Sequence, residues 1–191
     1  SAQVTENDED DRSLELGGRL DRRLAFGIDL ALTGLQTLSK EEETEATRQG
    51  GDLETFGESS LAGESIVRAV GRLKRDAWTF EAGGEAAYNF LDSDTRYAEN
   101  GVDIPLPSAS VKVEEKRAEV FGTVTWQGRP GLSVDAGGRL EVSEISQSGD
   151  ASTATSFFFA KPRVLVTWSP AEGRQWRVRL EREVGQLDFG D

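Results

Sequence analysis

One stretch of the sequence decides the fold: WTFEAGGEAAYNF, residues 78–90. Every second residue from Trp78 to Phe90 is apolar or small, and the residues between them are polar or small. A period of two places alternate side chains on opposite faces of a β-strand, and no helical period fits this pattern. The stretch therefore predicts a strand with one apolar and one polar face.

The same alternation recurs along the chain. The clearest repeat runs from Leu132 to Val142, where apolar or small residues alternate with Ser, Asp, Gly, Arg and Glu. Weaker repeats cover 24–32, 118–126 and 176–180. Together with the turn residues, these patterns predict eight strands, near 13–20, 23–39, 63–74, 77–91, 111–127, 132–146, 156–168 and 175–187.

The length of the alternations favours a membrane strand. Strands of globular proteins average about five or six residues, whereas these patterns last ten or more. At roughly 3.3 Å per residue and a tilt of about 45°, the steps from Trp78 to Tyr88 span on the order of 23 Å along the bilayer normal. That height is close to the apolar band of an outer-membrane barrel. The sequence thus predicts an all-β, antiparallel, up-and-down transmembrane β-barrel.

All four tryptophans lie beside short, turn-like segments, and each begins or ends an alternating stretch. Rings placed in this way form a row at one level of a sheet, as in the aromatic girdle at a membrane interface. The run 157–159 breaks the alternation, and we interpret it as an upper girdle in preference to a substrate-stacking patch. The aromatics expected at the membrane interfaces are Trp78, Tyr88, Phe90, Trp126, Trp168 and Trp176.

The composition excludes several functions. The net charge is −13, and the basic residues alternate with acidic ones, so a nucleic-acid partner is not expected. The chain contains no cysteine and no histidine, which removes thiolate and imidazole metal sites and any Ser-His-Asp or Cys-His triad within it. We expect no catalytic residue, no metal and no cofactor. An outer-membrane hydrolase would need its active residues outside this sequence.

Short turns and long polar segments alternate along the chain. The short turns centre near residues 21–22, 75–76, 129–130 and 172–173, and the long segments cover 40–62, 92–110 and 147–155. Outer-membrane barrels have short turns at one end and long loops at the other. The acidic tract 41–45 is therefore expected in a loop, which we interpret as solvated in preference to ligand-binding or cation-binding. Within the strands, paired glycines predict bends, and Pro162 predicts a bulge or weak pairing.

With these residues in view, the chain resembles a central part of the β-barrel of a TonB-dependent outer-membrane receptor. The amino-acid sequences of 159–168 and 176–191 are similar to those of proteobacterial members, and the expected architecture agrees over nearly the whole chain. The resemblance implies an outer-membrane location and a barrel of about 22 strands with a plugged lumen. Residues 1–191 would then be one barrel segment, without the plug domain, signal peptide or C-terminal strands.

The resemblance also implies a function and partners. Such a receptor takes up a scarce solute of the siderophore, cofactor or oligosaccharide class across the outer membrane. Its partners would be outer-membrane lipid, the plug domain and a TonB-type energy transducer that acts through other parts of the protein, and an unidentified small solute. The charged residues expected to face the lumen are Asp135, Arg139, Glu141, Arg177, Arg179 and Glu181.

Two alternatives stay open at this point. Eight strands suffice to close a small barrel, which would be a self-contained anchor with a structural role. Closure would require the first strand, around Leu16, to pair with the last, around Leu180 and Val184. The second alternative is a secreted, soluble β-sandwich, in which the tryptophans would be buried in the core. An open segment would leave two unpaired edges, so we expect the isolated chain neither to transport nor to fold stably.

Overall fold

The computed structural model describes residues 3–107, 109–149 and 152–182. Within these ranges the chain forms one antiparallel sheet with the order β1-β2-β3-β4-β6-β7-β8-β9, and β5 pairs with β4. No helix in these ranges is long and apolar enough to cross a bilayer. The strands are β1 (Gln3–Arg23), β2 (Ile28–Gln49), β3 (Asp52–Arg75), β4 (Trp78–Glu99), β5 (Val102–Ile104), β6 (Ser110–Arg129), β7 (Leu132–Gly149), β8 (Thr153–Ala171) and β9 (Arg174–Glu181).

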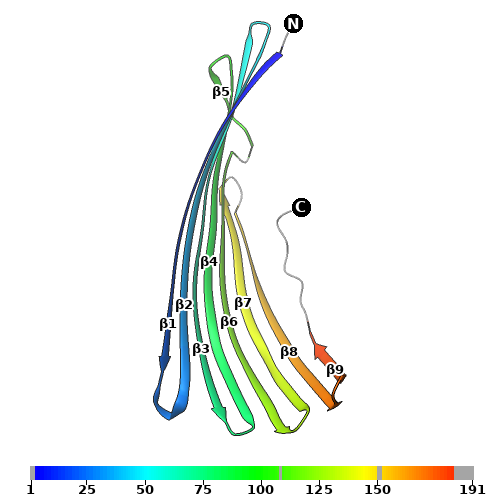
Figure 1. Cartoon of the computed structure of the whole chain (residues 1–191). Helices are drawn as coiled ribbons and strands as arrows, with labels where there is room; N and C mark the ends of the chain where they lie inside the picture. The colour runs from blue at the N-terminus through cyan, green and yellow to red at the C-terminus, as the bar shows by residue number, and fades with distance from the viewer. Residues whose placement is uncertain (1–2, 108, 150–151, 183–191) are drawn as a thin grey trace.

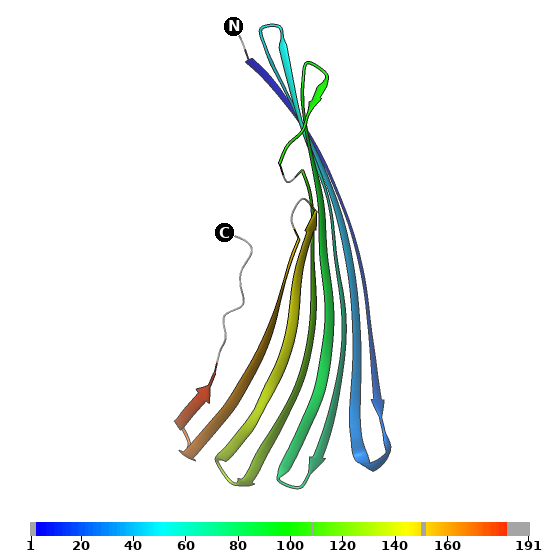
Figure 2. The same cartoon turned by 180° about the vertical axis from the view of Figure 1, so that it is seen from behind.

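The sheet is open and curved, with β1 at one edge and β9 at the other (Figures 1 and 2). Each long strand pairs with its neighbours along the chain, which confirms the predicted all-β, up-and-down architecture. The closed eight-stranded alternative required β1 to pair with β9. In the described part of the chain these strands lie at opposite edges, so Leu16 and Leu180 are not cross-strand neighbours. Val184 lies outside the described residues.

The pairing register divides the side chains between two faces. Trp78 lies opposite Trp126, and Ala86 lies opposite Ala118, so apolar positions of neighbouring strands share one face. We call this the apolar face; it includes Leu14, Leu16, Leu20, Leu30, Leu32, Val67, Trp78, Phe80, Val120, Val124, Leu140, Val142, Val164, Val178 and Leu180. We call the other the charged face; it includes Arg68, Arg72, Glu81, Glu85, Arg117, Glu119, Asp135, Arg139, Glu141, Lys161, Arg163, Arg177, Arg179 and Glu181.

The apolar face is open to the surroundings. Val67 is 64% exposed and Leu180 is 68% exposed, although both lie in regular strands. Apart from Gly63, the buried residues of the described chain are Ala87, Glu141 and Ser143, and these three lie on the charged face. Because curvature crowds side chains on the concave side of a sheet, the charged face is the concave one. This arrangement is the inverse of a soluble sandwich, whose apolar faces are covered.

The polar segment 40–62 is not a loop, contrary to the prediction. β2 and β3 continue through it and meet at the tight turn of Gly50 and Gly51, so the acidic tract 41–45 lies within β2. This hairpin projects well beyond the ends of β7 and β8 (Figure 1). Where both faces of a ladder are in water, charged side chains on both faces do not prevent pairing. The paired glycines are a hairpin signal that the loop prediction overlooked.

The second polar segment, 92–110, also contains strand. β4 continues to Glu99, and a turn at Asn100 and Gly101 leads into β5, which pairs back onto β4. Both turn residues have positive φ, 51° and 78°, as a type I′ hairpin turn requires. The third segment, 147–155, is shorter than expected because β7 extends to Gly149 and β8 begins at Thr153.

Pro162 does not form a bulge in β8, the first of the two predicted outcomes, whereas the pairing of β8 with β9 ends beside it, at Arg163. Pro162 pairs with Gly138 without a register shift, and the irregular pairings lie instead near Trp126 and Trp168. The carbonyl oxygen of Pro162 accepts a hydrogen bond of 3.1 Å from the amide of Arg182, just past the end of β9. The side of Pro162 without an N–H donor thus faces the end of β9, and the β7 ladder stays intact.

The predicted short turns all lie at one end of the sheet. They join β3 to β4, β6 to β7 and β8 to β9, and the 3₁₀ turn η1 (Ala25–Gly27) joins β1 to β2 at the same end (Figure 1). The first turn is a few residues later than predicted, because β1 continues to Arg23. The end with the longer connections carries the projecting hairpins.

Candidate functional site

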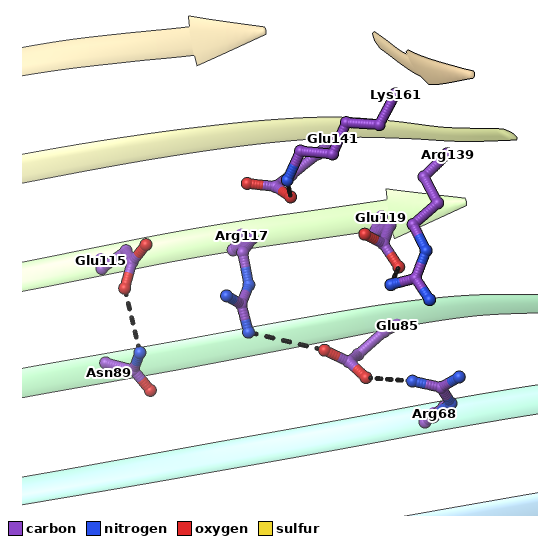
Figure 3. A network of polar contacts seen from close by, with 9 residues as sticks. All are labelled: Arg68, Glu85, Asn89, Glu115, Arg117, Glu119, Arg139, Glu141 and Lys161. Carbon is purple, nitrogen blue, oxygen red and sulfur yellow. Dashed lines mark hydrogen bonds and ion pairs between the residues drawn. The ribbon is translucent and has the colours of Figure 1, made fainter. Parts of the chain in front are cut away.

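A network of ion pairs crosses the charged face from β3 to β6 (Figure 3). One carboxylate of β4, Glu85, contacts Arg68 of β3 at 3.1 Å and Arg117 of β6 at 3.5 Å. The register places these residues near one another on adjacent strands of the same face. Further along β4, the side-chain amide of Asn89 donates to Glu115 at 3.0 Å.

The network continues across β6, β7 and β8. Arg139 of β7 contacts Glu119 of β6 at 3.2 Å, and Lys161 of β8 contacts Glu141 of β7 at 2.8 Å. Glu141 is only 5% exposed, so its charge depends on this partner. The result is a wall of cross-strand pairs of opposite charge.

An aromatic ring lies within this wall. Phe121 of β6 has the guanidinium carbon of Arg68 4.8 Å from its ring centre and that of Arg139 at 5.6 Å. Its cross-strand partner is Gly83, where a Cβ atom would stand 2.6 Å from Cζ of the ring. Because Gly83 has no side chain, the ring of Phe121 can occupy the space above it.

Beside Phe121 the charged face has a hollow of about 510 Å³. We call it the basic hollow, because its lining contains six basic side chains and two carboxylates, Glu81 and Glu181. This excess is local, since the chain as a whole has a net charge of −13. The basic residues are Arg68, Arg139, Lys161, Arg163, Arg179 and Arg182.

All six residues predicted to face the lumen lie on the charged face. Arg139, Arg179 and Glu181 line the basic hollow, and Arg179 contacts Glu181 at 2.6 Å. Asp135 accepts a hydrogen bond of 2.6 Å from Thr125, and Glu141 contacts Lys161. Arg177 lies on the same face outside the hollow.

The sequence-based selection missed much of the network. Arg68, Glu85, Arg117, Glu119, Phe121 and Lys161 all contribute to it. Their signal is the same period of two, because each of them except Arg117, which follows Lys116, lies between apolar or small residues of a predicted strand. Extending the alternation to β3, β4, β6 and β8 would have found them.

The predicted interface aromatics lie at two levels of the apolar face. At the short-turn end, Trp78 pairs with Trp126, with ring centres 6.3 Å apart, and Trp168 pairs with Trp176. Further along β4, Tyr88 and Phe90 are 6.1 Å apart. The run 157–159 is divided between the faces: its middle residue is on the apolar face, and its two outer rings stack at 6.0 Å on the charged face. The run is thus not an upper girdle as a unit.

Metal ligation is not apparent in the described ranges, where no group of three or more Asp or Glu residues is arranged to hold an ion.

The projecting hairpins carry many carboxylates. One of them, Glu99, accepts a hydrogen bond from Tyr97 and so raises the pKa of that phenol. Glu43 lies directly opposite Glu58, a like-charge pairing that costs stability.

No protein-family model matches this sequence, and no curated protein matches it significantly. The structure, in contrast, is similar to solved outer-membrane receptors. The ferric-catecholate import receptor Fiu from E. coli superposes with a TM-score of 0.64 at 10% identity, over 91% of this chain and 33% of that one. The pyoverdine outer membrane receptor FpvA from Pseudomonas aeruginosa gives 0.61 at 10% identity, over 86% of this chain and 28% of that one.

The ferric citrate transporter FecA gives a TM-score of 0.56 at 11% identity, over 90% of this chain and 27% of that one. This chain therefore spans between about a quarter and a third of the length of the receptors it matches. At such low identity the likeness defines the fold. The chain has the fold of a segment of the outer-membrane β-barrel of TonB-dependent receptors.

Proposed function

We propose that this chain is part of the barrel of a TonB-dependent receptor, which takes up a scarce solute across the bacterial outer membrane. The observation that carries the proposal is the division of one open sheet into an exposed apolar face and a paired, charged concave face. Lipid outside and a wet lumen inside are the two surroundings that such faces suit. The likeness in fold to three receptors and transporters supports the same function.

The apolar face contacts lipid in this proposal. In water, such side chains as Val67 and Leu180 would form an apolar surface much larger than soluble monomers expose. The four tryptophans would lie at the interface nearest the short turns, and Tyr88 and Phe90 at the opposite one. Amphipathic rings are enriched at these levels of outer-membrane barrels.

The charged face lines the lumen. Further strands of the complete protein pair with β1 and with β9 at the two edges of the sheet. An unpaired edge leaves backbone N–H and C=O groups without partners, which is costly in hydrocarbon, so the sheet has to close. The family barrel has about 22 strands around a plug. The plug therefore belongs to another part of the protein, and the energy transducer is a separate partner that acts through such parts. The solute stays within the siderophore, cofactor or oligosaccharide class.

Uptake in cells tests this function directly. Cells that lack the gene for the complete protein should lose accumulation of one labelled ferric siderophore, cobalamin or oligosaccharide from a panel. Complementation should restore uptake, and a protonophore should abolish it, because the energy comes from the inner membrane. Equal uptake of every solute with and without the gene, or uptake that persists with the protonophore, would refute the proposal.

Cysteine cross-linking tests the open edges, and residues 1–191 contain no native cysteine that would compete with the engineered pairs. In the complete protein, Leu16→Cys with Gln36→Cys should form a disulfide, since these residues are cross-strand partners. Leu16→Cys with Leu180→Cys should form none. A high yield for the second pair would establish a self-contained barrel and overturn the segment interpretation.

A further inference from the structure

We propose that the basic hollow binds a small solute that carries several carboxylate or phosphate groups. The inference rests on the proposed function, because the hollow then opens into the lumen along the path of the solute. It goes further by naming the charge and the hydrogen-bonding chemistry of that solute, and by assigning the residues that bind it.

The hollow has a local excess of positive charge. Arg68, Arg139, Lys161 and Arg179 each have a carboxylate partner within 3.2 Å. Arg163 and Arg182 also line the hollow, and no carboxylate of the described chain lies within ion-pair distance of either. Among the described residues, the wall around the hollow is thus neutralised pair by pair, whereas Arg163 and Arg182 are outside these ion pairs. A multiply charged anion would neutralise them.

The hollow is bordered by many N–H donors. A guanidinium presents five N–H donors in a planar fork that matches the two oxygens of a carboxylate or phosphate. The lining arginines come from β3, β7, β8, β9 and the residue after β9, so guanidinium groups from five segments border one hollow. Such an arrangement recognises a compact solute with more than one oxyanion group better than a single carboxylate.

The basic hollow is large enough for a small molecule. A volume of about 510 Å³ is within the range of small-molecule sites. Gly137 and Gly138 form part of the floor, and a Cβ atom at Gly137 would stand 2.8 Å from the hydroxyl oxygen of Thr123. Phe121 forms another part, with Arg68 and Arg139 over its ring. The small floor residues and the ring leave room between the cations.

Calorimetric titration of the complete protein in detergent tests the inference, with citrate and inorganic phosphate as probes and maltose as the neutral comparison. Citrate or phosphate should bind in a salt-dependent manner, and maltose should not. Arg163→Gln should weaken that binding by roughly tenfold, because a charge-assisted hydrogen bond is lost. Arg177→Gln is the matched control, since Arg177 lies on the same face outside the hollow, and its affinity should be that of the wild type.

Each outcome decides the inference. Binding of citrate alone identifies a carboxylate solute, and binding of phosphate alone identifies a phosphorylated one. Absence of binding by both probes, or an equal loss in Arg163→Gln and Arg177→Gln, overturns it, because the effect would then be absent or would arise from overall charge. If Arg163→Gln fails to fold, Arg182→Gln takes its place, since Arg182 lies beyond the last strand residue, Glu181.

Failure of the inference is distinguishable from failure of the proposed function. Folding into a barrel is monitored separately, by the change of gel mobility on heating and by resistance to trypsin. A heat-modifiable protein that transports a solute but binds neither probe would refute the basic hollow alone. A protein that neither enters the outer membrane nor transports would refute the proposed function.

Discussion

The ring of Phe121 lies over Gly83, its cross-strand partner on the charged face, in the space that a side chain at that position would fill. A Cβ atom at Gly83 would stand 2.6 Å from Cζ of the ring and 2.5 Å from the carbonyl oxygen of Ala69. One of these neighbours is backbone, which cannot move aside cheaply. The glycine thus fixes the ring between Arg68 and Arg139, on the floor of the basic hollow.

We predict that Gly83→Ala lowers the free energy of unfolding by about 1–3 kcal/mol, because the methyl group overfills a packed site. Urea unfolding of the complete protein in lipid vesicles measures the change. The control is Gly18→Ala, at a mid-strand glycine whose Cβ would meet nothing within 4 Å. Equal effects of the two substitutions would show that the space over Gly83 is not occupied by the ring.

A charge on the apolar face should be costly in lipid. We predict that Val67→Arg lowers the free energy of unfolding in vesicles by about 2–4 kcal/mol. Val67 is 64% exposed and lies between Gly34 and Ala86, so the longer side chain fits and the cost comes from its surroundings. Thr37→Arg is the control on the charged face, between Glu15 and Glu64. A Val67→Arg protein as stable as Thr37→Arg would contradict lipid contact.

The ion pair between Lys161 and Glu141 should be strongly coupled. Lys161→Met leaves a nearly buried carboxylate without its partner, and we predict a loss of about 3 kcal/mol in the free energy of unfolding. Adding Glu141→Gln should restore part of that loss, because the unpaired charge is then removed. A double-mutant cycle by urea unfolding measures the coupling. Arg12→Gln, at an exposed pair with Asp10, should change stability little, and additive effects at Lys161 and Glu141 would refute the coupling.

The tryptophans should lie at one depth of the bilayer. We consider variants that retain one of Trp78, Trp126, Trp168 or Trp176. Their tryptophan fluorescence should be quenched most by lipids whose acyl chains are brominated near the headgroup. Leu140→Trp in a background without the other tryptophans is the control, since Leu140 is mid-strand on the apolar face and should be quenched by bromine deeper in the chain. Quenching of all five by aqueous iodide alone would contradict membrane insertion.

The existence of the long strands and the division of their side chains between two faces follow from the sequence. A period of two is a property of the chain, because each extended residue reverses the direction of the next side chain. The alternation from Trp78 to Phe90 therefore predicts which residues of β4 share the apolar face, and the six charged candidates lie together on the opposite face of the sheet. The acidic tract 41–45 was misjudged because polarity on both faces indicates water, which a loop and a projecting hairpin share.

The pairing of the strands and its register are visible only in the three-dimensional structure. The same holds for the side chains that contact one another on adjacent strands. Glu85 contacts Arg68 and Arg117, and Phe121 lies over Gly83, because the register of β3, β4 and β6 aligns residues far apart in the chain. The basic hollow likewise gathers cations from strands at separate positions along the sequence. Alternation gives each strand two faces, but only pairing and curvature bring the charges of separate strands together in one site.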